Sequence, residues 1–198
     1  MQRQARIWRP PSGWVCRPTS RKHGCQRALA RFARLCPSVR VETTVERSPA
    51  LSALLGRGEL DLAMCFATAQ SDHASWASSI PMAWIGSPTY RRPADDPVRL
   101  AVFDPPCLFR AAAEAALDQA GIRWTVDFRS RSLAGLWAAV TAGLGVTVRT
   151  PEGLPPQLTT LGGAAGLPVL PTAILSLFDA ASPFRSRRRG WLKCSLRR

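Results

Sequence analysis

The chain has 198 residues, 46% of them hydrophobic, which is enough to bury the core of one ordinary domain or of two small lobes. It carries no recognisable secretory signal and no apolar run long enough to span a bilayer, so we expect a cytoplasmic protein with no membrane contact. The net charge of +14 is confined to the two ends of the chain. Residues 28–183 hold 13 arginines and 13 acidic residues, whereas residues 1–27 and 184–198 hold seven basic residues each and no acidic residue. This distribution argues against a nucleic-acid-binding face on the folded body.

The two ends also differ from the body in composition. Residues 1–27 form an atypical basic segment, and residues 184–198 predict a solvated, disordered basic tail. The alternative for that tail is RNA or DNA binding through the arginines at 187–189, with Trp191 stacking on bases. The abrupt changes also suggest a slip of the reading frame. A zinc site is conceivable at Cys16, His23 and Cys25, but the spacing fits no common zinc finger, and we expect no metal.

Helical and strand periods alternate through the first half of the body. Apolar residues at i, i+3, i+4 and i+7 indicate an amphipathic helix, and period-2 alternation indicates a half-buried strand. Pro37 ends the first helix because it cannot continue the ladder. The expected elements are a helix over 28–36, a half-buried strand over 39–46, a helix capped by Ser48 and closed by Gly58, and strands over 60–66 and 80–85.

The same pattern recurs in the second half. The expected elements are a strand over 98–103, a helix from Cys107 to about Ala120 stopped by Gly121, a strand over 124–128, a helix that Ser132 caps and Gly143 and Gly145 end, and strands over 146–148 and 174–178. Strands separated by helices predict a parallel sheet covered by helices.

We therefore expect an α/β fold of two similar lobes with a ligand cleft between them. Lobe one comprises residues 28–82 plus 173–183, and lobe two comprises residues 98–150, so that the domain spans 28–183. Clefts of this kind hold small ligands at helix N-termini and close around them.

At this point the sequence resembles the effector-binding (substrate-binding) domain of LysR-type transcriptional regulators. The resemblance covers roughly residues 28–180. It is carried by Leu-Ala-Arg-Phe-Ala-Arg-Leu-Cys-Pro-Ser-Val at 29–39, Gly-Glu-Leu-Asp-Leu-Ala at 58–63, Ser-Leu-Ala-Gly-Leu at 132–136 and Val-Thr-Ala-Gly-Leu-Gly-Val-Thr-Val at 140–148. The motifs are specific in their order and spacing, although each is weak alone.

The resemblance implies a type 2 periplasmic-binding-protein-like fold with two Rossmann-like lobes. It further implies a small, often anionic effector between the lobes, and side-by-side homo-oligomers. Members of the family read DNA through an N-terminal winged helix-turn-helix. Only 27 residues precede the first expected helix, so we expect a truncated regulator that lacks this domain. We expect DNA contacts only through a helix-turn-helix domain that this chain does not carry. The family's first strand and ligand loop should also precede residue 28, where the sequence departs from the pattern.

Helix N-termini present free N–H groups and a partial positive charge, which suit a carboxylate. From the helix starts and one strand end that should face the cleft, we expect effector contacts from Ser48, Cys107, Ser130, Arg131, Ser132 and Thr147. Each has a structural alternative: Ser48 and Ser132 as plain helix caps, Cys107 as a small residue at a helix start, Arg131 as a solvated loop residue, and Thr147 as an ordinary strand residue.

No catalytic constellation is evident in the sequence. There is no Gly-x-Ser-x-Gly elbow, and the glycines at 143 and 145 end a helix instead of opening one, as a dinucleotide fingerprint would. We therefore expect a ligand-sensing module that is not an enzyme and carries no cofactor. The alternatives are a solute-binding protein of a transporter, an enzyme on the same fold, and nonspecific nucleic-acid binding by the tails.

Overall fold

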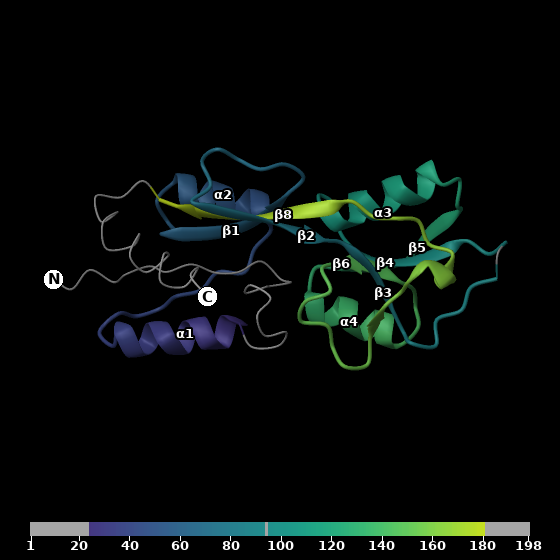
Figure 1. Ribbon diagram of the computed structural model, residues 1–198, viewed down its shortest axis with the longest axis horizontal. Helices are drawn as coiled ribbons and strands as arrows, with labels where there is room; N and C mark the ends of the chain where they lie inside the picture. Colours follow the sequence, from purple (N-terminus) through teal and green to yellow (C-terminus); the bar gives the residue numbers. More distant parts are fainter. Residues whose placement is uncertain (1–23, 94, 181–198) are drawn as a thin grey trace. The chain divides into compact units, whose positions relative to one another are not determined.

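The computed structural model describes residues 24–93 and 95–180, and Figure 1 shows their course. The expectations for the basic ends, including the zinc site and the disordered tail, lie outside the described residues. The chain divides into two compact units. The described part of unit 1 comprises residues 24–65, 72–76 and 177–180, and that of unit 2 comprises 66–71, 77–93 and 95–176. The lobe boundaries expected from the sequence stay a prediction. No helix in the described ranges is long and apolar enough to cross a membrane.

Unit 1 is organised around helix α2 (Ser48–Gly56) and strand β1 (Leu62–Ala67). Leu51 of α2 is fully buried. It belongs to a small apolar cluster with Leu60, Ala63 and Cys65. The strand predicted over 60–66 is therefore confirmed, shifted by a residue or two, and this cluster is the core of unit 1 among the described residues.

Two expectations for unit 1 are wrong, the strand over 39–46 and the cap by Ser48. The stretch 39–46 forms no strand, and Val45 is 51% exposed. Alternating side chains define an apolar face, but a strand also needs a neighbouring strand to accept its backbone hydrogen bonds. The first expected helix is confirmed as α1 (Gly24–Leu35), and Leu29 on its apolar face is 38% exposed. Ser48 does not cap α2: Arg47 occupies the cap position without a side-chain hydrogen bond, and Ser48 begins the helix itself.

The strand predicted over 80–85 is two strands, β2 (Trp76–Pro81) and β3 (Ala83–Gly86), that join different sheets. Strand β2 lies in a sheet of order β1-β8-β2, in which β8 (Thr172–Asp179) is the last strand of the chain. Strand β3 pairs antiparallel with both β6 (Thr147–Arg149) and β7 (Thr159–Thr160). The expected all-parallel arrangement is therefore wrong for β3, because period-2 patterning does not encode strand direction.

Unit 2 is built on strand β4 (Val98–Phe103), which pairs in parallel with β5 (Trp124–Ser130). Helices α3 (Leu108–Gln119) and α4 (Leu133–Thr141) lie on opposite sides of these strands in Figure 1. The alternation of side chains along β4 explains this arrangement. One face of β4 packs in the cluster of α3, through Val98, Leu100 and Val102, and the other packs in the cluster of α4, through Ala101 and Phe103.

The ends of α3 and α4 follow from glycines that the sequence identifies. Gly121 and Gly143 have φ values of 65° and 76°, a left-handed conformation that favours glycine. Each donates its N–H to the carbonyl oxygen three residues earlier, and the next residue donates to the carbonyl five residues earlier. This is the Schellman arrangement, so both predicted helix ends are confirmed. The remaining short element is a 3-10 helix, η1 (Gly163–Ala165), in the glycine-rich segment before β8.

Candidate functional site

A small pocket lies in unit 2 where β4 and β6 end. Leu100 of β4 bridges Val146 in parallel, so both strands present their carboxyl ends at one edge, where α/β proteins bind ligands. The cavity volume is about 10 Å³, which is room for about one water molecule. It is lined by Val102, Phe103, Cys107, Phe109, Arg110, Leu136, Thr147, Val148 and Arg149.

Arg149 is the most unusual residue of this pocket. It ends β6, its backbone pairs with Ala83 of β3, and only 5% of the residue is exposed. Its guanidinium carbon Cζ lies 4.1 Å from the ring centroid of Phe103 and 4.8 Å from that of Phe109. Burial removes water from the charged form and lowers the pKa of Arg149 to about 10, while the nearby Cys107 acts in the opposite direction. The side chain therefore stays cationic at neutral pH.

A second arginine of the lining comes from the first turn of α3. The Nε of Arg110 donates to Glu114 Oε1 at 2.7 Å, one turn further along the helix. The Nη1 atom of the same guanidinium is buried and makes no hydrogen bond within the described structure. One end of Arg110 is thus satisfied by an ion pair, and the other end is a buried donor that needs an acceptor.

Two of the residues predicted for the site line this pocket. Thr147 is 2% exposed and lies on β6, where it pairs with Ile85 of β3. Cys107 is half-buried and occupies the N-cap position of α3 in an extended conformation, with no side-chain capping bond. The structure therefore brings together a thiol, a hydroxyl and two guanidinium groups, although Cys107 and Thr147 are 40 positions apart in the sequence.

Three further predicted residues form a separate group at the start of α4. Ser132 is the N-cap, and its Oγ accepts from Gly135 N at 3.2 Å, so the predicted cap is confirmed. Ser130 Oγ accepts from Ser132 N at 3.0 Å. Arg131 Nε donates to Asp104 Oδ2 at 3.0 Å while 87% of its side chain is exposed. These contacts account for all three residues structurally, and their part in effector binding stays a prediction.

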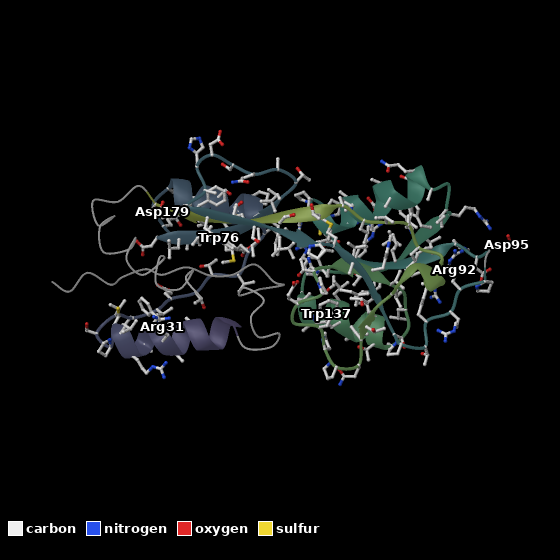
Figure 2. All side chains as sticks on the ribbon, in the orientation of Figure 1. Arg31, Trp76, Arg92, Asp95, Trp137 and Asp179 are labelled. Atoms are coloured by element: carbon white, nitrogen blue, oxygen red, sulfur yellow. The ribbon has the colours of Figure 1, made fainter. Side chains whose placement is uncertain are left out.

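Ser48, the sixth predicted residue, lies in unit 1, where its carbonyl oxygen accepts a weak hydrogen bond from Cys65 Sγ at 3.7 Å. Figure 2 shows the side chains of both units, with Trp137 marking α4 of unit 2. Sequence reasoning missed Arg149, Arg110 and the two phenylalanines. The available signal was a basic residue that directly follows Val-Thr-Val at 146–148, the expected strand.

The sequence of this chain is similar to those of known regulatory proteins. A family model described as the LysR substrate binding domain matches residues 15–158. The chain is 36% identical over 146 residues to the HTH-type transcriptional regulator PecT of Dickeya dadantii (strain 3937), which covers 72% of this chain and 45% of that protein. The chain spans about half the length of the curated relatives it matches.

Solved structures show the same fold at low sequence identity. The C-terminal domain of a probable LysR family transcriptional regulator from Rhodococcus sp. RHA1 is 18% identical, with a TM-score of 0.64 and coverage of 96% of this chain and 98% of that one. The CcmR regulatory domain of Synechocystis PCC6803, solved in complex with 2-PG, is 13% identical, with a TM-score of 0.62 and coverage of 97% of both chains. These neighbours and the mixed α/β structure confirm the fold class expected from the sequence, the type 2 periplasmic-binding-protein-like fold.

Proposed function

Because this chain belongs to the LysR substrate-binding domain family, we propose that it senses a small anionic effector and regulates transcription in response. The observation that carries the anionic part of the proposal is the pocket of unit 2, whose lining includes Arg110 with a buried Nη1 that has no hydrogen-bond acceptor in the described structure. A buried donor without an acceptor is unfavourable, so such a pocket favours an anion that supplies one. The position of the effector between two lobes, expected from the resemblance, stays a prediction.

The role of the whole protein is part of the same proposal. PecT is named a transcriptional regulator, and the family resemblance implies homo-oligomers whose DNA contacts come from a helix-turn-helix domain. A regulator of transcription acts on DNA in the cytoplasm and performs no chemical step on its effector. A solute-binding protein of a transporter, the alternative raised by the sequence, is not favoured by this relative.

The binding part of the proposal is tested with the purified full chain. We expect a thermal-shift screen of small carboxylates, phosphates and matched neutral amides to yield an anionic compound that raises the melting temperature by several degrees. A ligand at one hundred times its dissociation constant stabilises the folded state by about 2.7 kcal/mol. A screen in which no anion binds, or in which the neutral analogues bind equally well, would contradict the proposal.

The regulatory part is tested with a chimera. The region of PecT outside the alignment with this chain is fused to the full chain, and a reporter is placed under a promoter that PecT recognises. We expect reporter expression to depend on the compound identified in the screen. A matched chimera carrying an unrelated domain of similar size controls for loss of function through fusion, and expression that ignores the compound would contradict a sensing role.

A further inference from the structure

Strand β1 is the end strand of its sheet among the described residues. In Figure 1, β8 runs beside β1. The strand order is β1-β8-β2, so β8 covers one edge of β1 and no described strand covers the other, which we call the outer edge. The N–H and C=O groups along a strand edge need hydrogen-bond partners, and another extended backbone supplies them at the spacing of a ladder. The outer edge of β1 is therefore a place where one more strand can be added.

The segment 39–46 has the alternating pattern of a strand, yet it forms none in the structure. Val41 and Val45, on its apolar side, are 39% and 51% exposed. Residues 47–61, which include α2, connect this segment to β1, and a crossover of this length can join two parallel strands of one sheet. The segment is therefore connected and patterned as a strand of the sheet of β1, but the described residues offer it no strand to pair with.

The apolar core of unit 1 is also small. Its cluster of buried residues has four members, whereas the two clusters of unit 2 have eleven and seven among the described residues. On β1, Ala63 and Cys65 are buried in the cluster of unit 1. Leu62 and Met64, which alternate with them, are only half-buried. Side chains of a strand next to β1 would cover the exposed parts of these two residues and enlarge the core.

We propose that unit 1 binds an extended apolar segment of another polypeptide, which inserts between β1 and 39–46 and pairs with both. Every described strand already pairs within a sheet, and the sequences of 1–23 and 181–198 contain no apolar run longer than three residues, so neither supplies a segment of this kind. A second copy that offered its own β1 would cover the outer edge and leave 39–46 without a partner. Strand addition uses backbone hydrogen bonds for affinity and side-chain contacts for specificity. This surface is separate from the pocket of unit 2 and goes beyond effector sensing.

The chemistry of the partner segment follows from its place in the sheet. A strand between two others is covered on both faces, so such a strand is a near-continuous apolar run rich in β-branched residues. Strand β1 contains no charged residue over Leu62–Ala67, so a charge opposite it would find no counter-charge on β1. Proline is excluded inside the segment because it cannot donate to the ladder. The six residues of β1 set the length of the segment at about six residues.

The test adds a synthetic peptide to the full chain. The peptide carries the run Val-Ile-Val-Val-Thr-Ile between pairs of lysines, whose charges oppose self-association. The matched control peptide has proline in place of the third valine of the run. Binding is followed by hydrogen exchange of the backbone amides, with up to about 1 mM peptide. We expect the apolar peptide to slow exchange in both 39–46 and 62–67 and to raise the melting temperature, because a ligand of the folded state stabilises it, and the proline peptide to do neither.

Two proline variants of the chain test the pairing with 39–46. Neighbouring residues of a strand direct their N–H groups to opposite sides, so one of Thr43→Pro and Thr44→Pro removes an N–H that faces the inserted strand. We expect at least one of them to weaken peptide binding about tenfold, the effect of one lost ladder hydrogen bond. Neither substitution interrupts a helix or strand of the structure. The matched control is Val169→Pro, at a residue 94% exposed in an irregular stretch of unit 2, which should bind the peptide as the wild type does.

Several results would overturn the inference and leave the proposed sensing function intact. The first is no binding of the apolar peptide at the highest concentration, and the second is equal binding of the proline peptide. Wild-type binding by both Thr43→Pro and Thr44→Pro, or slower exchange in 62–67 alone, excludes insertion next to 39–46. Amides of β1 that are as protected in the free chain as in the complex show that the outer edge is already covered. Analytical ultracentrifugation then tells whether a second copy or the chain itself covers it.

Discussion

Arg149 and Phe103 form a cation–π pair inside unit 2, with the guanidinium Cζ 4.1 Å from the ring centroid. The two residues end β6 and β4, which lie close together because Leu100 and Val146 form a parallel bridge. The arginine is 5% exposed and the phenylalanine 6% exposed, so water screens the attraction little. The pair therefore joins the ends of two strands and orients the charge of the pocket.

A double-mutant cycle measures this pair. We expect Phe103→Leu and Arg149→Met to be coupled by about 0.5–2 kcal/mol in the free energy of unfolding, the range for a desolvated cation–π contact. Urea unfolding of the four proteins gives the coupling. The control cycle combines Phe103→Leu with Arg99→Met, whose exposed arginine pairs with Asp127, and should give a coupling near zero. Equal coupling energies in the two cycles would show that the contact contributes nothing specific.

Gly145 is required by the close approach of its backbone to β4. A Cβ at this position would lie 2.6 Å from the carbonyl oxygen of Arg99, which accepts the hydrogen bond of Val146 N. Backbone cannot move aside as a flexible side chain can, so we expect Gly145→Ala to lower the free energy of unfolding by about 3 kcal/mol, the upper range for overpacking.

The matched control lies two residues earlier. Gly143 has a φ of 76° but no atom within 4 Å of an added Cβ, so Gly143→Ala introduces backbone strain alone and should reduce stability by about 1–2 kcal/mol. Chemical denaturation of both variants checks the difference. A Gly145→Ala variant no less stable than Gly143→Ala would contradict the importance of the approach to β4.

Ser132 stabilises α4 through its cap. Its Oγ accepts from Gly135 N at 3.2 Å, so Ser132→Ala should reduce the free energy of unfolding by about 1 kcal/mol. Ser132→Asp keeps an acceptor at the same place and should retain most of the stability. Thermal and urea unfolding check both variants. A similar loss in Ser132→Asp and Ser132→Ala would show that the hydroxyl acts in some way other than as a cap.

Asp127 makes stability depend on pH in the acid range. The hydrogen bond from Thr125 Oγ1, at 2.6 Å, and that from Arg99 hold the pKa of Asp127 below its usual value of 3.8. A carboxyl with a lowered pKa stabilises the fold above its unfolded pKa, and this contribution is lost as the pH falls through the folded value.

The variant Asp127→Asn should therefore be less stable than the wild type at neutral pH, by no more than about 1 kcal/mol because the group is near the surface. The two proteins should converge as the pH falls below the folded pKa of Asp127. Urea unfolding across the acid range measures the difference. A difference that stays constant with pH would rule out the carboxylate charge as its source.

Local sequence signals predicted the helix ends and inward faces of unit 2 well. The Schellman turn at Gly121 involves only neighbouring residues, and the cap by Ser132 spans three positions. Strand β4 was placed at the correct residues because its apolar run is buried on both faces. These features depend on contacts within a few residues, and the amino-acid order specifies them directly.

The strand expected over 39–46 is absent for the opposite reason. Alternation and helical period describe which side chains share a face, but a partner element must cover that face. Val45, at 51% exposure, has no such cover among the described residues. Likewise, the split of 80–85 into β2 and β3 depends on which sheets accept each half.

The sequence alone determined the family, the α/β class, most elements of unit 2 and two of the pocket residues, Cys107 and Thr147, because periodicity, glycine and cap signals are local. Only the tertiary structure revealed the pocket itself. Its chemistry comes from Arg149 and from Phe103 and Phe109, which precede it by at least 40 positions and meet it where parallel strands end. The local sequence does not show whether water or aromatic rings surround a charged side chain on an expected strand. The packing of α3 and β6 against β4 decides that.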